Sequence, residues 1–124
     1  MISPAVSKTA SQNIGDITSA RRVLKIEADA LLMLSENLGA SFVRALDILG
    51  DTQGRVIVSG MGKSGHIGKK IAATFASTGT PSYFVHPAEA SHGDLGMITT
   101  LDSIFALSNS GETSELADIV AYSS

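Results

Sequence analysis

Apolar and polar positions follow two different patterns along the chain. Over residues 17–37 apolar side chains recur on one helical face, and a second set of this kind follows over residues 39–50. Past residue 55, short β-branched or aliphatic runs alternate with helix-like segments. We therefore expect a helical hairpin over residues 17–50, followed by a βαβαβα order over residues 55–124.

The expected strands are the apolar runs at residues 55–59, 82–85 and 102–107. Helices are expected over residues 64–77 and 112–122, and an irregular stretch with one or two helical turns over residues 86–97. Strands that alternate with helices are typical of parallel strands joined by right-handed crossovers. The sequence therefore predicts an α/β fold with a parallel βαβ sheet and flanking helices.

Two features concern the limits of this domain. Three strands are fewer than the roughly five or more of a doubly wound sheet. We therefore expect an incomplete domain, the front part of a larger protein, whose third strand exposes an edge. Residues 1–16 mix Ser, Thr, Pro and Asn without an apolar run, so we expect a flexible tail and no secretory signal there.

Composition narrows the class of protein. The net charge is −3 and no basic stripe is interleaved with aromatics, which argues against a nucleic-acid partner. Cysteine is absent, which excludes disulfides and a thiol nucleophile and is compatible with the cytoplasm. No apolar run approaches the ~18 residues of a membrane span. We therefore expect a cytoplasmic protein without a membrane partner.

Two turns of small residues carry the candidate chemistry. Each follows an expected strand and precedes an expected helix, at residues 60–65 and at residues 108–113. Such turns leave unpaired backbone N–H groups at the positive end of a helix dipole, which attracts an anion. The two turns would line up along one edge of a parallel sheet. They therefore predict a phosphorylated small molecule as ligand.

Two nucleotide-binding motifs fit the first turn less well. Gly60, Gly62 and Gly65 match the dinucleotide fingerprint, but no acid ends the second expected strand, and the nearest one is Glu89. A Walker A loop would need a leading glycine where the chain has Ile57. Neither a dinucleotide nor a P-loop nucleotide is therefore favoured.

Polar residues in and near the turns are the candidate site residues. Lys63 is either a solvated loop lysine or a fixed positive charge for a phosphate or a developing oxyanion. Ser108, Ser110 and Thr113 offer more hydroxyls than a helix cap requires, which favours phosphate binding. Glu115 follows in the expected last helix, where its carboxylate could act as a base beside a bound sugar.

Two histidines belong to the same region. His86 ends the second expected strand, where ligands of open α/β sheets bind. His92 lies in the irregular stretch that could fold back over that edge. Their spacing leaves a metal pair open as one interpretation.

Several segments resemble the arabinose-5-phosphate isomerases of the sugar isomerase (SIS) domain superfamily. They read GMGKSGHIG at residues 60–68, ATFASTGTP at 73–81, FVHP at 84–87, SHGDLGM at 91–97 and SNSGETSE at 108–115. The resemblance implies a SIS-type, flavodoxin-like or Rossmann-like fold. It also implies interconversion of D-ribulose 5-phosphate and D-arabinose 5-phosphate through an enediol, an early step towards the Kdo sugar of lipopolysaccharide.

The resemblance further implies roles for single residues. The positions that match substrate-binding residues of the family are Ser64, Gly79, Thr80, His86, His92, Ser108, Ser110 and Thr113. Lys63 and Glu115 match catalytic positions. His86 also matches a metal-associated position, where Zn²⁺ would bind, although no cofactor is expected to be required. Gly79 and Thr80 lie at the other end of the second expected strand, so they could matter only across a subunit boundary.

Family members continue beyond this chain. They have the rest of the SIS domain, with another catalytic glutamate and a histidine, and then a pair of CBS modules. The resemblance implies a homo-oligomer, which is a tetramer in the family. Two other interpretations stay open: a SIS module that only binds a sugar phosphate, as in regulators with a helix-turn-helix ahead of the domain, and an isomerase of another ketose phosphate.

Overall fold

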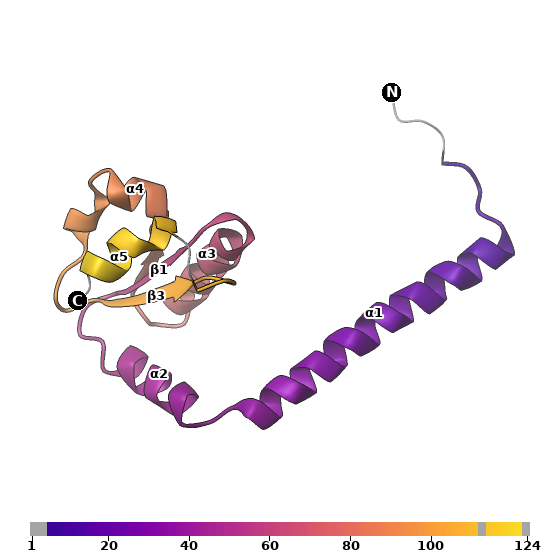
Figure 1. The fold of residues 1–124 in the computed structure, drawn as a ribbon, viewed down its shortest axis with the longest axis horizontal. Coiled ribbons are helices and arrows are strands. Elements are labelled where there is room, and N and C mark those ends of the chain that lie inside the picture. Colours follow the sequence, from indigo (N-terminus) through magenta and orange to yellow (C-terminus); the bar gives the residue numbers. More distant parts are fainter. Residues whose placement is uncertain (1–4, 112–113, 123–124) are drawn as a thin grey trace. The chain divides into compact units, whose positions relative to one another are not determined.

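The computed structural model of the chain describes residues 5–111 and 114–122. In chain order its elements are α1 (Ala10–Asn37), α2 (Ala40–Gly50), β1 (Val56–Gly60), α3 (Gly62–Ser77), β2 (Ser82–Phe84), α4 (Pro87–Ser91), the 3₁₀ helix η1 (Asp94–Met97), β3 (Ser103–Leu107), the 3₁₀ helix η2 (Ser114–Leu116) and α5 (Ala117–Tyr122) (Figure 1). The chain divides into two units, Met1–Phe42 and Val43–Ser124. The first unit contains α1, and the second contains the sheet.

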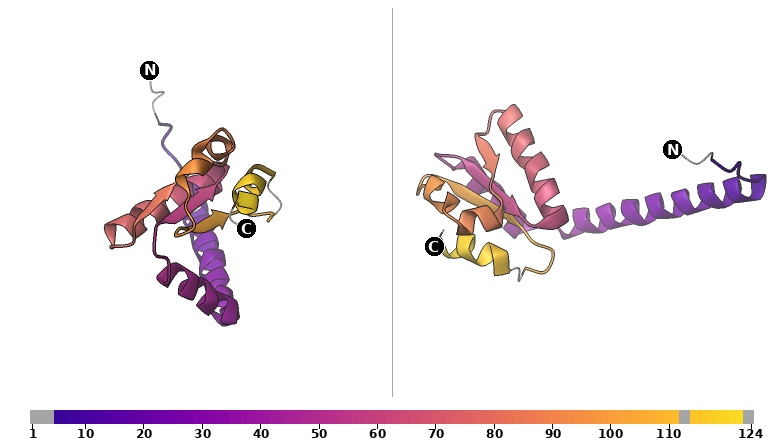
Figure 2. Two further views of the ribbon diagram at one scale, coloured as in Figure 1. Left: turned by 90° about the vertical axis from the view of Figure 1, so that its left-hand side faces the viewer. Right: turned by 90° about the horizontal axis from the view of Figure 1, so that it is seen from above.

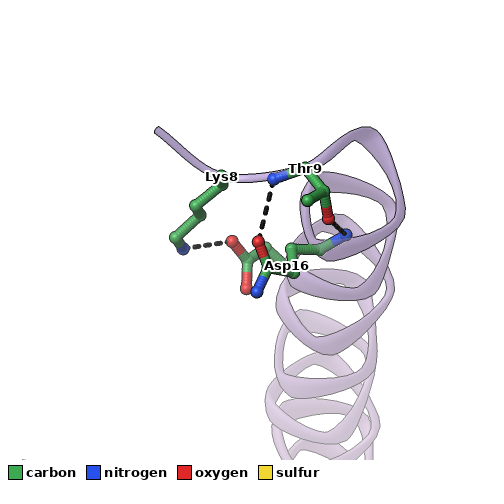
Figure 3. Close-up of polar contacts among 4 residues, drawn as sticks. Lys8, Thr9 and Asp16 are labelled. Atoms are coloured by element: carbon green, nitrogen blue, oxygen red, sulfur yellow. Dashed lines mark hydrogen bonds and ion pairs between the residues drawn. The ribbon is translucent and has the colours of Figure 1, made fainter. Parts of the chain in front are cut away.

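Helix α1 begins at Ala10, earlier than residue 17, where the apolar pattern predicted its start. A capping box explains the difference, because Thr9 Oγ1 accepts from the Gln12 N–H at 3.3 Å while Gln12 Oε1 accepts from the Thr9 N–H at 2.8 Å. Lys8 pairs with Asp16 beside this cap (Figure 3). Residues 10–16 are therefore helical and are not part of a flexible tail. The packing of the first two helices as a hairpin stays a prediction.

The three strands form one parallel sheet in the order β2-β1-β3. Val56 at the start of β1 pairs with Ser82 of β2 and with Ser103 of β3. All five residues of β1 are buried, as suits a central strand with helices on both faces and an unbroken Val-Ile-Val run. The expected α/β fold with a parallel βαβ sheet is confirmed.

Helices cover both faces of this sheet. Val56 and Val58 of β1 pack with Ala72 of α3 in one buried cluster. Ile57 points to the other face, where it packs in a second cluster that includes Ile119 of α5. Figure 2 shows α3 and α5 on opposite sides of the strands. Because side chains of a strand alternate between faces, the single run in β1 supplies both cores.

The stretch after β2 and the end of the chain contain only short helices. Residues 86–97 hold α4 and η1, which confirms the expected one or two helical turns. The last helix was expected from Glu112, which lies outside the described residues, as does Thr113; η2 starts at Ser114 and α5 at Ala117. No helix within residues 5–111 and 114–122 combines the length and the apolar character that a membrane span needs.

Asp102 links the segments that precede β1 and β3 through hydrogen bonds at the amino ends of these strands. Its Oδ1 accepts from the Arg55 N–H at 2.7 Å, and its Oδ2 accepts from the Thr99 N–H at 2.8 Å. The hydroxyls of Thr52 and Ser103 lie 2.5 Å apart at the same edge. Burial raises the pKa of Asp102, but hydrogen bonds from Thr99 and Arg55 outweigh burial, so its pKa lies below the ordinary 3.8.

We expect Asp102→Asn to destabilise the second unit by about 1–3 kcal/mol, because the new amide group places a donor against an N–H group. The pKa of Asp102 is lower in the folded than in the unfolded chain. Its contribution is therefore present above the unfolded pKa and is lost as the pH falls through the folded pKa.

Urea unfolding measured from about pH 7 down to about pH 2.5 tests this linkage. The wild-type chain should lose more stability over that range than Asp102→Asn. Asp51→Asn, at an exposed position, serves as the matched control and should keep the wild-type slope. The same slope in Asp102→Asn as in the wild type would contradict the role of this carboxylate.

Candidate functional site

The carboxyl ends of the three strands meet at one edge of the sheet. Because the order is β2-β1-β3, the turn after β1 lies between the turns that follow β2 and β3. Lys63 and Ser64 follow β1, His86 follows β2, and Ser108 and Ser110 follow β3. The structure thus brings these predicted site residues to the edge where open α/β sheets bind ligands.

Three glycines make the turn between β1 and α3 tight. A Cβ atom on Gly65 would lie 2.6 Å from the carbonyl oxygen of Gly60, and one on Gly60 would lie 3.1 Å from the carbonyl group of Ser64. Gly62 has a φ of +56°, a left-handed conformation that other residues rarely adopt. The glycine pattern therefore lets α3 start directly against the end of β1.

This turn leaves hydrogen-bond donors open at the start of α3. The N-cap residue Met61 makes no side-chain cap hydrogen bond, and the Gly65 N–H donates to the Met61 carbonyl at 3.2 Å. The N–H groups of Gly62, Lys63 and Ser64 come before this bond and have no intrahelical partner. The exposed side chain of Lys63 adds a positive charge beside them. This position is suited to an anion such as phosphate.

The hydroxyl group of Ser108, the first residue after β3, closes the turn that follows this strand. Ser108 Oγ accepts from the Gly111 N–H at 2.9 Å, and Gly111 has a φ of +72°. A hollow of about 620 Å³ beside this turn is lined by both residues and by small side chains of η2 and α5, such as Ser114. The predicted site residue Thr113 lies outside the described residues, and only the backbone of Glu115, in η2, lies within them.

The two histidines lie at opposite ends of α4. His86 is the N-cap residue, and its Nδ1 accepts from the Ala88 N–H at 3.2 Å. His92 is the C-cap residue and is exposed. Within the part of the chain that the structure describes, no three His, Cys, Asp or Glu side chains are grouped so as to hold a metal ion. The Ala88 N–H group occupies the lone pair of His86 Nδ1, so this nitrogen is not open to the Zn²⁺ that the resemblance implied there.

Gly79 and Thr80 precede β2, so they lie at the opposite edge of the sheet from Lys63. Gly79, with a φ of +98°, lines a separate hollow that it shares with Arg55 and Tyr83. Burial is the main cause that raises the pKa of Tyr83, and the nearby Asp102 carboxylate raises it further. A substrate role for Gly79 and Thr80 stays a prediction. As the sequence indicated, such a role would require a second subunit.

Sequence analysis missed the aromatic side chain that supports the edge. A Cβ atom on Gly68 would lie 3.0 Å from the Phe84 ring, and one on Gly65 would lie 3.6 Å from it. The Lys69 ammonium lies 5.5 Å from the centre of the same ring. Phe84 thus fixes α3 against the end of β2, two residues before His86. The sequence signal that could have revealed Phe84 is the spacing of small residues on α3, because it leaves room for a large side chain on the facing strand.

Comparison with known proteins assigns the family. The model of the SIS domain matches residues 51–123, more than half of the chain. The chain belongs to the SIS domain family. The expected SIS-type fold and the resemblance stated above are confirmed.

Relatives of this SIS domain chain include two arabinose 5-phosphate isomerases named KdsD. The one from Pseudomonas aeruginosa is 59% identical over 110 residues, which are 89% of this chain and 34% of that protein. The one from Yersinia pestis is 55% identical over 102 residues, 82% of this chain and 31% of that protein. The chain therefore spans about a third of the length of these curated relatives.

A solved structure supports the same relationship. The structure of E. coli CFT073 c3406 in complex with A5P matches this SIS domain chain with a TM-score of 0.79 and 42% sequence identity. The match covers 92% of this chain and 60% of that chain. The fold of the described residues is thus shared with a protein that binds A5P.

We expect Gly65→Ala to lower the stability of the second unit by about 1–3 kcal/mol, because the added methyl group would overlap the carbonyl of Gly60. Gly96→Ala is the matched control, since a Cβ atom there would meet nothing within 4 Å. Urea unfolding of the two variants and the wild type checks the difference. Equal transition midpoints for Gly65→Ala and Gly96→Ala would contradict the proposed close contact.

Titration with inorganic phosphate should shift the backbone amide resonances of Lys63, Ser64 and Gly111 in ¹H–¹⁵N spectra of the chain. These N–H groups lie in the two turns at the carboxyl edge, where an anion is favoured. The amides of Gly79 and Thr80, at the opposite edge, are the internal control and should stay unchanged. Shifts of equal size at both edges would show that phosphate does not select the turns.

Proposed function

We propose that the chain is the amino-terminal part of an isomerase that interconverts D-ribulose 5-phosphate and D-arabinose 5-phosphate. The observation that carries the proposal is an edge of the sheet suited to an anion, in a chain 59% identical to an arabinose 5-phosphate isomerase. Lys63 and the open N–H groups of α3 lie at that edge. A solved relative in complex with A5P supports the same ligand class.

The reaction moves one proton between neighbouring carbon atoms of the sugar. A base removes the proton from the carbon next to the carbonyl group, which gives an enediolate. The proton then returns to the neighbouring carbon, and a hydroxyl proton passes from one of the two oxygen atoms to the other, so that the carbonyl group has changed position. Positive charge and N–H donors beside the oxygen stabilise the enediolate. The carboxyl edge of this sheet supplies both kinds of group.

We assign roles at this edge as follows. Lys63 stabilises negative charge on the reacting oxygen atoms, and Glu115 is the base. Hydroxyl groups and backbone donors hold the phosphate, and the residues concerned are Ser64, Ser108, Ser110 and Thr113. His92 contacts the sugar. The register of the sheet supports this division, because Gly60 and Leu107 are paired at the ends of β1 and β3, so the two turns leave neighbouring strands at the same edge.

The proposal extends to assembly and cellular setting. Gly79 and Thr80 lie at the far edge of the sheet, so their contact with substrate requires a second subunit. We therefore propose a homo-oligomer in which one subunit completes the site of another. The protein would act in the cytoplasm, on the route to the Kdo sugar of lipopolysaccharide.

A chimera tests the catalytic role of Lys63. This chain replaces the matching segment of the P. aeruginosa relative, which supplies the remaining two thirds of the enzyme. Lys63→Met in the chimera should lower kcat/KM for D-ribulose 5-phosphate by about 100-fold or more, because a fixed charge beside the oxyanion is removed. The measurement is the formation of D-arabinose 5-phosphate in a coupled assay.

Lys70→Met is the matched control, because Lys70 is also an exposed lysine of α3 and lies outside the site. It should keep the kcat/KM of the unsubstituted chimera. Near-normal turnover by the Lys63→Met chimera would contradict the catalytic role of Lys63. An unsubstituted chimera that binds D-arabinose 5-phosphate without turnover would instead indicate a module that only binds the sugar phosphate.

A further inference from the structure

A local hydrogen bond holds the ring of His86. Its Nδ1 accepts from the backbone N–H of Ala88 at 3.2 Å and so caps α4. A backbone N–H can only donate, so Nδ1 carries no proton in this arrangement. The neutral ring must then carry its proton on Nε2. The cap therefore selects one of the two tautomers.

The segment that presents His86 is well fixed. Pro87 and Ala90 of α4 are buried, and Ser91 Oγ donates to Asp118 Oδ2 of α5 at 2.6 Å. The ring itself is half-buried. The cap and the packing of α4 thus hold the imidazole at the carboxyl end of β2.

The Nε2–H group has no hydrogen-bond partner among the residues that the structure describes. Every buried side-chain nitrogen or oxygen in that part of the chain has a partner. Nε2 is therefore reached by solvent. It lies at the same sheet edge as the turns after β1 and β3. A donor in this place is available to a bound molecule.

Neither ring nitrogen can bind a metal ion while the cap is present. A metal ion on Nδ1 would displace the Ala88 N–H directly. A metal ion on Nε2 would move the ring proton to Nδ1, which would then face the Ala88 N–H as a second donor.

We propose that His86 is a tautomer-locked, neutral Nε2–H donor to an acceptor oxygen of the ligand, and that it is not a zinc ligand. Resting on the proposed function, this assigns the acceptor to a carbonyl or hydroxyl oxygen of the sugar phosphate. Neutral imidazole is a suitable donor in an enediolate-forming site, because it polarises oxygen without giving up a proton.

Nitrogen NMR of the chain with ¹⁵N-labelled histidine tests the tautomer without any ligand. His86 should show an unprotonated Nδ1 and a protonated Nε2 at neutral pH. His66 and His92, both exposed, are internal controls and should show mixed tautomers. A protonated Nδ1 at His86, or the same mixture as in the controls, would overturn the proposal.

Addition of equimolar zinc chloride to the same sample tests the metal. The ring nitrogens of His86 and the amide of Ala88 should keep their resonances. Zinc bound at His86 with a displaced Ala88 amide resonance, and loss of that binding in His86→Ser, would overturn the proposal.

Two variants in the chimera test the donor. His86→Ser keeps an oxygen atom that can cap α4 but lacks an N–H group that reaches as far as Nε2. It should raise KM for D-ribulose 5-phosphate about tenfold, which corresponds to the loss of one hydrogen bond. His86→Gln carries an amide N–H of similar reach and should recover most of this loss. An unchanged KM in His86→Ser would overturn the donor role. An inactive unsubstituted chimera would refute the proposed function alone, since the tautomer is measured separately.

Discussion

The close approach of α3 to the end of β1 determines the geometry of the whole carboxyl edge. Gly60 and Gly65 touch at a separation that no Cβ atom would permit, and Gly62 supplies the left-handed backbone that turns the chain between them. The first turn of α3 therefore starts at the middle of the sheet edge with its N–H groups open. A longer connection would carry these donors away from the loops that follow β2 and β3.

The two edges of the sheet serve different purposes. At the amino edge, Asp102 satisfies the backbone donors of Arg55 and Thr99, and the Thr52 and Ser103 hydroxyls meet. At the carboxyl edge, donors of α3 stay open and the Nε2–H of His86 faces solvent. Water can satisfy these open donors in the free chain, and a ligand can take its place. The closed amino edge thus stabilises the sheet that presents the open one.

The sequence predicted the elements whose signal is local. The Val-Ile-Val run of β1, the glycines of the first turn and the alternation of strands and helices identified the parallel sheet and its ligand edge. The start of α1 at Ala10 was missed because the prediction used the apolar periodicity, which begins at residue 17. The capping box formed by Thr9 and Gln12 marks the true start of the helix. The bond from Ala88 to His86 was beyond prediction, because His-Pro-Ala does not specify ring orientation. Phe84 under α3 likewise depends on the register of β2 against β1.

Backbone dipoles supply part of the positive potential at the carboxyl edge. Under the proposed function, the site stabilises a phosphate and an enediolate while a carboxylate base works beside them. Each extra cation near that carboxylate would lower its pKa and weaken it as a base. Backbone N–H groups of α3 and a neutral His86 stabilise oxygen anions without a full positive charge. Under the proposed function, Lys63 is the cation of the first turn, and the backbone donors share the stabilisation of the oxygen anions with it.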